Sequence, residues 1–529
     1  MIIRLIGEKF SGIFSHNARV VSASKIIKLA VFVTGFSGIL IEYIISTIAS
    51  YLLGDTLFQW ALIISLFLFA MGIGSRITGY IKSDEAICFV VVESLLSLVI
   101  VVSLTGAYAS MAYPVAVRFV LYGSTLLVGI LIGMEIPLLI RLNSRFADLA
   151  LNLSRLLEKD YIGALVGGIF FAFIGLSRFG PLTLGILVAL LNWLVALIFW
   201  LYFGHQIAKG RAVAVIICFV GVLTCAALPF GNAVASWGED RKYRDEIIYS
   251  EQTPYQKIVI TRWRQFFWLY LDGHLQFSSY DEYRYHESLV HPAMLASASR
   301  ENVLILGGGD GLAAREVLKY RDVKNVTLVD IDPAITNLAR THPLLVDLND
   351  MSLKDPRVRV INDDAGAFLD RSPQIWDVII IDLPDPRTPT LERLYSVEFY
   401  RNCKRHLSRG GVMVTQATSP VFSPYAFWCI VKTMEEAGFY AVPMHAYVPT
   451  FGDWGWVIGS DFPEEILRSR IESHWDYVTF SVKFLSLEVL KTLFIFSPAD
   501  KIDFQKVEKN SFLKPVLYQY YRQGLWGLE

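Results

Sequence analysis

Seven long apolar runs occupy most of the first 231 residues, and no other feature of the sequence limits its fold as strongly. A helix that crosses a bilayer needs ~20 mainly apolar residues, and most of the runs reach that length. They cover residues 27–49, 57–80, 86–107, 117–140, 160–177, 180–203 and 211–231. The sequence therefore predicts an α-helical multi-pass membrane domain over residues 1–235, with about seven spans and the lipid bilayer as a partner.

Basic residues gather in alternate loops of this region, which sets its expected orientation. The groups precede the first run and follow the second, fourth and sixth: Arg4, Lys9, Arg19, Lys25 and Lys28; Arg76 and Lys82; Arg141, Arg145, Arg155 and Lys159; Lys209 and Arg211. Because cytoplasmic loops are rich in Lys and Arg, we expect a cytoplasmic N-terminus in the cell membrane. Seven full spans would place the C-terminal domain outside, away from cytoplasmic nucleotides. We therefore expect the shortest run, 160–177, to be re-entrant and the C-terminal domain to be cytoplasmic.

Three glutamates, Glu42, Glu93 and Glu135, lie inside apolar runs. A carboxylate at such a position costs on the order of 2.5–3.5 kcal/mol on insertion scales. Two interpretations stay open. The glutamates form a cation-binding site or relay between helices, or they are protonated or hydrogen-bonded side chains that hold the helices together.

Smaller features add limits. Gly163 and Gly167 have the spacing of close helix packing, and residues 142–159 are typical of an amphipathic helix on the cytoplasmic face. The net charge of −1 argues against a nucleic-acid partner, which would require a basic face. The five cysteines lack CxxC spacing, so neither a disulfide framework nor a zinc site is supported.

The remainder of the chain predicts two soluble parts. Residues 240–285 have strand composition with a hairpin signal at Asp272-Gly273, which indicates a small β-domain. Residues 286–529 alternate strands and helices, which predicts a doubly wound, Rossmann-like sheet of the methyltransferase type. The expected strands are 303–306, 326–329, 358–361, 377–381 and 411–416, then 440–447 and 455–459; the expected helices are 312–320, 333–340, 365–370, 396–407 and 424–437.

Acidic residues follow the expected strands, beside a glycine-rich turn at 307–311. They are Asp310, Asp330, Asp364, Asp382 and Asp385. Ligands of such sheets bind outside the carboxyl ends of the strands, so these acids are expected to line a site for a cationic ligand. Asp330 has the spacing of a ribose-binding acid, and Asp364 is expected near an adenine edge. For each acid alone, helix capping is the competing explanation.

At this point the sequence resembles a known family. The matching segments are Tyr255-Gln256, Leu271-Asp-Gly-His-Leu-Gln276, Asp281-Glu-Tyr-Arg-Tyr-His-Glu287, Gly307-Gly-Gly-Asp-Gly311, Val329-Asp-Ile-Asp332, Asp364-Ala365, Asp382-Leu-Pro-Asp-Pro386 and Gln416. In order and spacing they resemble the polyamine aminopropyltransferases, the spermidine synthase family. The apolar region resembles the N-terminal extension of a membrane-bound bacterial subset of that family.

The resemblance implies decarboxylated S-adenosylmethionine as the donor co-substrate, with no cofactor and no metal. It implies donor-binding roles for a set of residues: Gln256, Gln276 and His286 at the nucleoside and aminopropyl groups, Asp310 at the aminopropyl ammonium, Asp330 at the ribose, and Asp364, Ala365 and Leu391 at the adenine. It also implies a homodimer or a higher homo-oligomer.

On the acceptor side, the resemblance implies that Tyr285, Asp382 and Asp385 position a polyamine amine. Putrescine is the expected acceptor, and spermidine and methylthioadenosine are the expected products. An alkyl ammonium has a pKa near ~10.4 by analogy with lysine, so it must lose a proton before it can attack. Asp382 is the expected catalytic base for an in-line displacement.

The chain departs from the family pattern at three positions. Leu383-Pro384 stands where soluble members carry a serine pair, and Asp330 stands where a glutamate is usual. Phe451 lies where soluble members carry a tyrosine near the diamine, which leaves the acceptor open. Two other functions stay open: a methyltransferase that uses S-adenosylmethionine, since this sheet also occurs in such enzymes, and a polyamine sensor or transporter whose nucleotide-binding domain is not catalytic.

Overall fold

The computed structural model describes residues 16–54, 56–81, 84–144, 149–203, 210–243, 245–500 and 502–526. The chain divides into two compact units, Met1–Glu246 and Ile247–Glu529. Several basic residues used above for the orientation lie outside the described residues: Arg4, Lys9, Lys82, Arg145 and Lys209.

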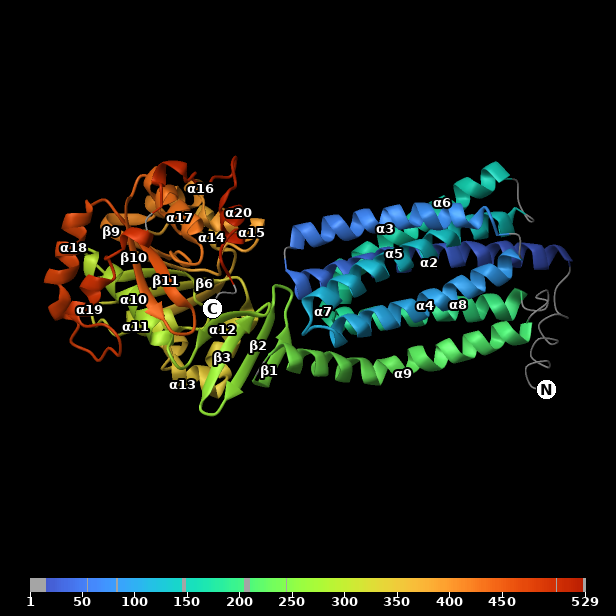
Figure 1. Ribbon diagram of the computed structural model, residues 1–529, viewed down its shortest axis with the longest axis horizontal. Coiled ribbons are helices and arrows are strands. Elements are labelled where there is room, and N and C mark those ends of the chain that lie inside the picture. Colours follow the sequence, from blue (N-terminus) through green and yellow to red (C-terminus); the bar gives the residue numbers. More distant parts are fainter. Residues whose placement is uncertain are drawn as a thin grey trace. The chain divides into compact units, whose positions relative to one another are not determined.

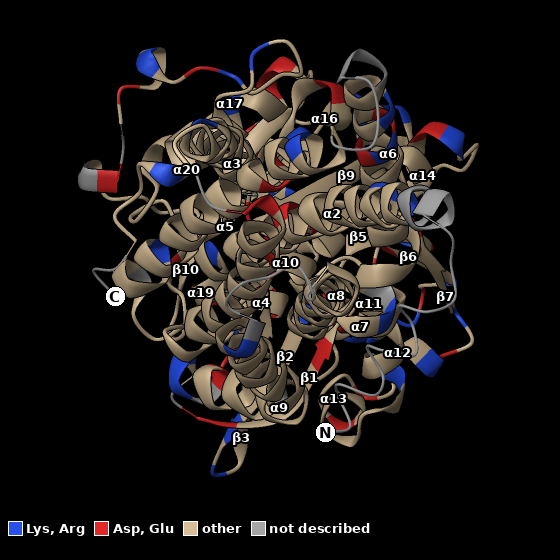
Figure 2. Cartoon of the chain, turned by 90° about the vertical axis from the view of Figure 1, so that its right-hand side faces the viewer, with Lys and Arg blue, Asp and Glu red and all other residues tan. Residues whose placement is uncertain are grey.

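The N-terminal unit is a bundle of long helices that lie side by side (Figure 1). Its helices are α2 (His16–Leu53), α3 (Thr56–Thr78), α4 (Glu85–Ala109), α5 (Pro114–Asn143), α6 (Leu149–Phe170), α7 (Leu176–Phe179), α8 (Pro181–Phe203) and α9 (Gly210–Lys242). Helices seen end-on in Figure 2, such as α4 and α8, are almost entirely in the colour of uncharged residues. Within the described residues, six helices are long and apolar enough to cross a membrane: α2, α3, α4, α5, α8 and α9.

The expectation of about seven spans, one of them re-entrant, needs correction at residues 160–177. This segment is not among the six, because α6 carries the charged run Glu158-Lys159-Asp160. It does not turn back either: α6, a π-helical turn (Phe171–Gly175) and α7 form one unbroken helix. A Cβ at Gly163 would lie 3.0 Å from the carbonyl carbon of Phe32, and one at Gly167 would lie 2.7 Å from the carbonyl oxygen of Phe36. The contact positions advance in the same direction along both helices, from Phe32 to Phe36 and from Gly163 to Gly167, so α6 runs parallel to α2.

The predicted surface helix at 142–159 is also wrong as one element. The helix α5 ends at Asn143 and α6 begins at Leu149, while residues 145–148 lie outside the described residues. Residues 149–159 are the first turns of α6, because the glycines that follow pack this helix against α2.

The C-terminal unit begins with a four-stranded sheet in the order β1-β2-β3-β4. The strands are β1 (Glu246–Gln252), β2 (Lys257–Trp263), β3 (Phe266–Leu271) and β4 (His274–Ser278). The β3–β4 turn is formed by Asp272 and Gly273, both with positive φ, as the hairpin signal predicts.

The second sheet has seven strands in the order β10-β11-β9-β8-β5-β6-β7. Its strands are β5 (Asn302–Gly307), β6 (Asn325–Asp330), β7 (Val358–Asn362), β8 (Trp376–Asp382), β9 (Leu407–Gln416), β10 (Tyr440–Val448) and β11 (Gly452–Ser460). The helices that follow or flank them are α10 (Glu282–Ala296), α11 (Leu312–Leu318), α12 (Pro333–Thr341), α13 (Pro343–Leu348), α14 (Ala365–Arg371), α15 (Pro389–Glu392), α16 (Val397–Arg405), α17 (Pro424–Glu436), α18 (Glu464–Ser473), α19 (Leu487–Thr492) and α20 (Leu517–Arg522). The strands β5 to β9 are parallel, and β10 and β11 are antiparallel, so the predicted α/β fold class is confirmed.

Both faces of the central strands are buried, which explains why their sequences are apolar throughout. Val303 and Ile305 of β5 belong to a core cluster with residues of α10 and α11. Leu304 and Leu306 belong to a second cluster with residues of α14, α16 and α17. From β5 the chain builds one half of the sheet through β6 and β7, and the other half starts at β8. The carboxyl ends of β5 and β8 are therefore the switch point where ligands of such sheets bind.

Candidate active site

The switch point brings the glycine-rich turn against Asp382. Gly307 is paired with Asp382 across β5 and β8. The backbone N–H of Gly308 donates to the carbonyl oxygen of Asp382 at 3.0 Å. Gly308 has a φ of 61°, and a Cβ there would lie 3.2 Å from Oδ2 of Asp382. Glycine at this position lets the turn approach the carboxylate closely.

Asp382 lies at the end of β8 with a hydroxyl and an imidazole beside it. The Tyr285 hydroxyl donates to its Oδ1 at 2.7 Å, and Nε2 of His286 lies 4.0 Å from its Oδ2. Burial raises the pKa of Asp382, while the charge of His286 and the bond from Tyr285 lower it. The result is a carboxylate with a pKa above its usual range, as a general base at neutral pH requires.

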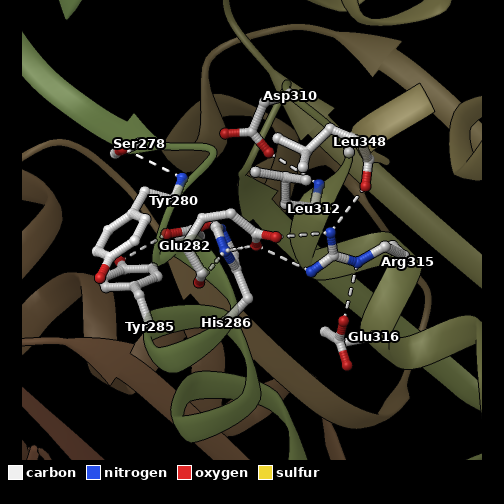
Figure 3. A network of polar contacts seen from close by, with 12 residues as sticks. Ser278, Tyr280, Glu282, Tyr285, His286, Asp310, Leu312, Arg315, Glu316 and Leu348 are labelled. Atoms are coloured by element: carbon white, nitrogen blue, oxygen red, sulfur yellow. Dashed lines mark hydrogen bonds and ion pairs between the residues drawn. The ribbon is translucent and has the colours of Figure 1, made fainter. Parts of the chain in front are cut away.

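A buried ion network holds His286 in place (Figure 3). Glu282 accepts from Nδ1 of His286 at 2.9 Å and receives two bonds of 2.9 Å from the Arg315 guanidinium. Burial opposes the charged form of His286, but the bond and charge of Glu282 prevail and raise its pKa to about 9. His286 is therefore a cation at neutral pH.

Glu282 is a functional residue that the sequence analysis missed. Its signal was present, because Glu282 and His286 are four residues apart and so lie on one face of a helix. The two cations beside it hold the pKa of Glu282 below its usual range in spite of burial.

Asp310 lies in the turn between β5 and α11, two residues before the helix begins. Its Oδ1 accepts from the backbone N–H of Leu312 at 2.8 Å, and its other oxygen accepts no hydrogen bond from the residues drawn in Figure 3. Burial raises the pKa of Asp310 to about 6, against the opposing charge of His286. The charge of Asp382 acts on it as well, so the fold brings Asp310, Asp382 and His286 together.

Asp330 at the end of β6 is tied to the turn that follows β5. It accepts from the backbone N–H of Gly309 at 3.0 Å and of Asp332 at 2.9 Å. Burial raises its pKa to about 7. Gln256 donates from Nε2 to Asp332 at 2.9 Å, so it lies near this edge. Gln276 in β4 donates instead to the carbonyl of His274 at 3.1 Å.

Asp364 acts as a helix cap in this structure. Its Oδ1 accepts from the backbone N–H of Ala367 at 2.9 Å, and its Oδ2 pairs with Arg393. Ala365 is the buried first residue of α14, and Leu391 lies half-buried in α15. Capping, the competing explanation for a single acid, therefore accounts for one oxygen of Asp364.

Asp385 is nearly covered, with 5% of its surface exposed, and its oxygens already have partners. Gln416 donates to Oδ1 at 3.2 Å, and the Tyr521 hydroxyl donates to Oδ2 at 3.0 Å. Arg387 lies 3.6 Å from Oδ2. Burial raises the pKa of Asp385, while these three groups lower it. Tyr521 and Arg387 were missed, and no local pattern links α20 to this loop.

Phe451 lies against Tyr285, with ring centroids 6.2 Å apart, and packs at a tilt on Trp454, with centroids 4.9 Å apart. Nδ1 of His445 donates to Asp453 at 2.9 Å. Burial lowers the pKa of His445, but the bond and charge of Asp453 outweigh it, so the pKa is raised. Asp453 is thus not a free partner for a second ammonium.

The site at this edge of the sheet combines several carboxylates with one protonated imidazole, that of His286. Asp310, Asp382 and Asp385 can attract a cationic ligand, and Asp382 can take a proton from it. Within the described ranges, no group of three or more His, Cys, Asp and Glu is arranged to hold a metal ion.

Comparison with known proteins agrees with this chemistry. The family model described as the spermine/spermidine synthase domain matches residues 282–466. A polyamine aminopropyltransferase of Leptospira interrogans is 40% identical over 495 residues, which cover 93% of this chain and 97% of that protein. Polyamine aminopropyltransferase 2 of Aquifex aeolicus is 39% identical over 503 residues, or 94% of this chain and 99% of that protein. A solved spermidine synthase of Thermotoga maritima covers 48% of this chain and 85% of its own, at 26% identity and a TM-score of 0.44.

Proposed function

Because the chain belongs to the polyamine aminopropyltransferase family and is an aminopropyltransferase, we propose that it transfers the aminopropyl group of decarboxylated S-adenosylmethionine to putrescine, with spermidine and methylthioadenosine as products. The observation that carries this proposal is the contact of Tyr285 and His286 with Asp382, next to Asp310, at the switch point of the sheet.

On the donor side, Asp310 holds the aminopropyl ammonium, since its second oxygen is not used by α11. Asp330 accepts or donates to the ribose hydroxyls, because a carboxyl with a pKa of about 7 is present in both forms. The other donor-binding residues in this proposal are Gln256, Gln276, His286, Asp364, Ala365 and Leu391. The donor is a co-substrate, and the reaction requires no cofactor.

In the chemical step, Asp382 accepts a proton from the acceptor ammonium. The amine nitrogen then attacks the carbon next to the sulfonium: the new N–C bond forms as the C–S bond breaks, and its electron pair leaves with neutral methylthioadenosine. One proton is released to solvent for each transfer. His286 keeps Asp382 ionised, and Tyr285 orients Oδ1. General base catalysis of this kind is typically worth roughly 10²–10⁴ in rate.

On the acceptor side, Tyr285 and Asp385 position the diamine. The bonds from Gln416 and Tyr521 fix the Asp385 carboxylate, so the diamine meets an oriented acceptor group. Phe451 offers no hydroxyl, and Asp453 is occupied by His445, so we expect weaker binding of putrescine than in enzymes with a tyrosine at this position.

The direct test is to incubate the purified full chain in detergent with the decarboxylated donor and a panel of amines, and to measure release of methylthioadenosine. Putrescine, cadaverine, agmatine and spermidine form the panel. We expect putrescine to be used as the acceptor. Phe451→Tyr should strengthen the apparent binding of putrescine by about tenfold, since one hydrogen bond to a charged group is worth about 1.5–3 kcal/mol. A hundredfold preference for another amine, together with no effect of Phe451→Tyr on putrescine, would refute the assignment of putrescine.

We further propose that the N-terminal unit lies in the cell membrane and that the catalytic unit is cytoplasmic. The supply of the substrates in the cytoplasm supports this side for the catalytic unit, and six helices are long and apolar enough to cross the membrane. Within the N-terminal unit, the Tyr51 hydroxyl at the end of α2 donates to Glu239 near the end of α9 at 3.4 Å, so the chain leaves the bundle at the end opposite to the start of α2. A cytoplasmic catalytic unit therefore requires the start of α2 to lie outside, against the orientation expected from the basic loops. A C-terminal alkaline phosphatase fusion is expected to be inactive in bacterial cells, and an active fusion would place the catalytic unit outside.

A further inference from the structure

Two carboxylates inside the N-terminal unit have no partner among the described residues. Glu93 of α4 and Glu135 of α5 are 0% and 1% exposed, and neither oxygen of either side chain accepts or donates a hydrogen bond. Glu42 of α2 is also buried, but its carboxylate oxygens are not among the fully buried atoms without a hydrogen-bond partner. Native proteins satisfy most buried polar groups, so a buried pair without partners indicates a bound species.

Helix packing brings a third acid to the same level of the bundle. Ile132 of α5 packs at Gly38 of α2, where a Cβ would lie 3.6 Å from its Cγ2. One turn further along α5 is Glu135, and one turn back along the antiparallel α2 is Gly35. A Cβ at Gly35 would lie 2.8 Å from Oδ1 of Asp160 on α6. Glycine at position 35 thus leaves room for Asp160 beside Glu135.

The charges that act on Glu135 are negative, those of Glu93 and Asp160. On the surrounding helices, α8 has no Asp, Glu, Lys or Arg, and Arg76 of α3 is exposed. Glu158 and Lys159 directly precede Asp160 on α6 and pair with each other at 2.8 Å. The other charged side chains of these helices are Lys25, Lys28 and Glu42 on α2, Arg118 and Arg141 on α5, Arg155 on α6, Glu85 on α4, and Arg211, Glu239, Arg241 and Lys242 on α9. Arg141 donates from Nη1 to the carbonyl of Ile81 at 3.4 Å, and its Nε and Nη2 are buried without a hydrogen-bond partner among the described residues.

From this geometry we propose that Glu93 and Glu135 form a proton-binding site in the N-terminal unit, which exchanges its proton through Asp160. Two neighbouring ionised carboxylates without a cation would be too costly in an apolar interior. A hard metal cation takes roughly six to eight oxygen ligands, and the described residues contain no metal-binding group of three. A proton needs only one oxygen, and half-buried Asp160 offers it a route to and from the pair.

Infrared difference spectroscopy on the full chain in lipid vesicles tests this site directly. Spectra of the protein with ¹³C-labelled glutamate are recorded from about pH 5 to about pH 10. We expect a carboxylic acid band at neutral pH that disappears at the alkaline end. Glu93→Gln and Glu135→Gln should remove it, and Asp160→Asn should slow its exchange in D₂O. Glu158→Gln, a half-exposed acid on the same helix as Asp160, is the matched control and should change nothing.

Three results would overturn the proposal. The first is a spectrum with no glutamic acid band at neutral pH, which needs only the wild-type protein and so does not depend on how the variants fold. The second is an acid band that never titrates, since a permanently protonated pair only holds helices together. The third is a shift of the ionised carboxylate bands on addition of Na⁺, K⁺ or putrescine at constant pH, which would show a different cation at the pair.

Discussion

Removing one hydroxyl from the C-terminal helix should weaken the acceptor site without disturbing the fold. Tyr521 of α20 donates to Oδ2 of Asp385 at 3.0 Å from 136 residues away. Its ring also packs on Trp526, with centroids 4.8 Å apart, and that contact survives in Tyr521→Phe. The substitution therefore removes the hydroxyl's bond to Asp385 and its interaction with Arg387, and it keeps the ring.

The size of the effect follows from the burial and charge of Asp385. A hydrogen bond to a charged group contributes about 1.5–3 kcal/mol, which corresponds to roughly ten- to a hundredfold in kcat/KM for the acceptor. The Tyr521 bond is one of the groups that lower the pKa of Asp385 against burial. Its loss moves this pKa further upward, so acceptor use in Tyr521→Phe should recover in part as the pH rises.

The assay is release of methylthioadenosine with putrescine varied at saturating donor, and then with donor varied at saturating putrescine. We expect kcat/KM for the acceptor to fall and the donor KM to stay within about twofold, because the side-chain partners of Asp385 in the described part of the chain are Gln416, Tyr521 and Arg387. Tyr520→Phe is the matched control, because Tyr520 is on the same helix and its hydroxyl accepts from the backbone of Glu508 instead. If both variants behave like the wild type, or if donor KM changes as much as acceptor KM, Tyr521 does not act on the acceptor through Asp385.

Three further predictions concern the carboxylates at the switch point. Asp382→Asn should keep donor binding but lose turnover by roughly 10²-fold or more, since an amide cannot take a proton; near-normal turnover at neutral pH would remove Asp382 from that role. Donor KM should rise as the pH falls through about 6, because Asp310 then becomes neutral, and Asp310→Asn should flatten this dependence. Calorimetry should show much weaker binding of S-adenosylmethionine than of its decarboxylated form, because its carboxylate repels Asp310, and Asp310→Asn should narrow the gap. Equal affinity with detectable methyl transfer would point to a methyltransferase instead.

The sequence by itself determined the sheet and the edge on which the site lies. The strands β5 and β8 are almost entirely apolar because both of their faces are buried, and β5, β6 and β8 end at Gly307, Asp330 and Asp382. Parallel strands bring their carboxyl ends to one edge, so acids that follow successive strands meet without any long-range information. That rule is why Asp310, Asp330 and Asp382 could be grouped from spacing alone.

Tertiary structure decided which partners these acids have. One oxygen of Asp364 caps a helix and the other pairs with Arg393, and Asp453 is bonded to His445. The sequence had left both of these acids available for a ligand. Tyr521 reaches Asp385 only because α20 packs beside the end of the sheet. Hydrogen bonds between residues far apart in the chain depend on how whole elements pack, which no local pattern records.

In the helical bundle too, the sequence determined the helices and tertiary structure determined their contacts. Apolar runs of sufficient length fixed its helices, because hydrophobic burial depends mainly on composition. Whether residues 160–177 turn back or continue was decided by the approach of Gly163 to Phe32 on α2, which keeps the helix straight beside its neighbour. Likewise, the sequence placed Glu93 and Glu135 in apolar runs, but only the packing of the helices shows that neither carboxylate has a hydrogen-bond partner among the described residues.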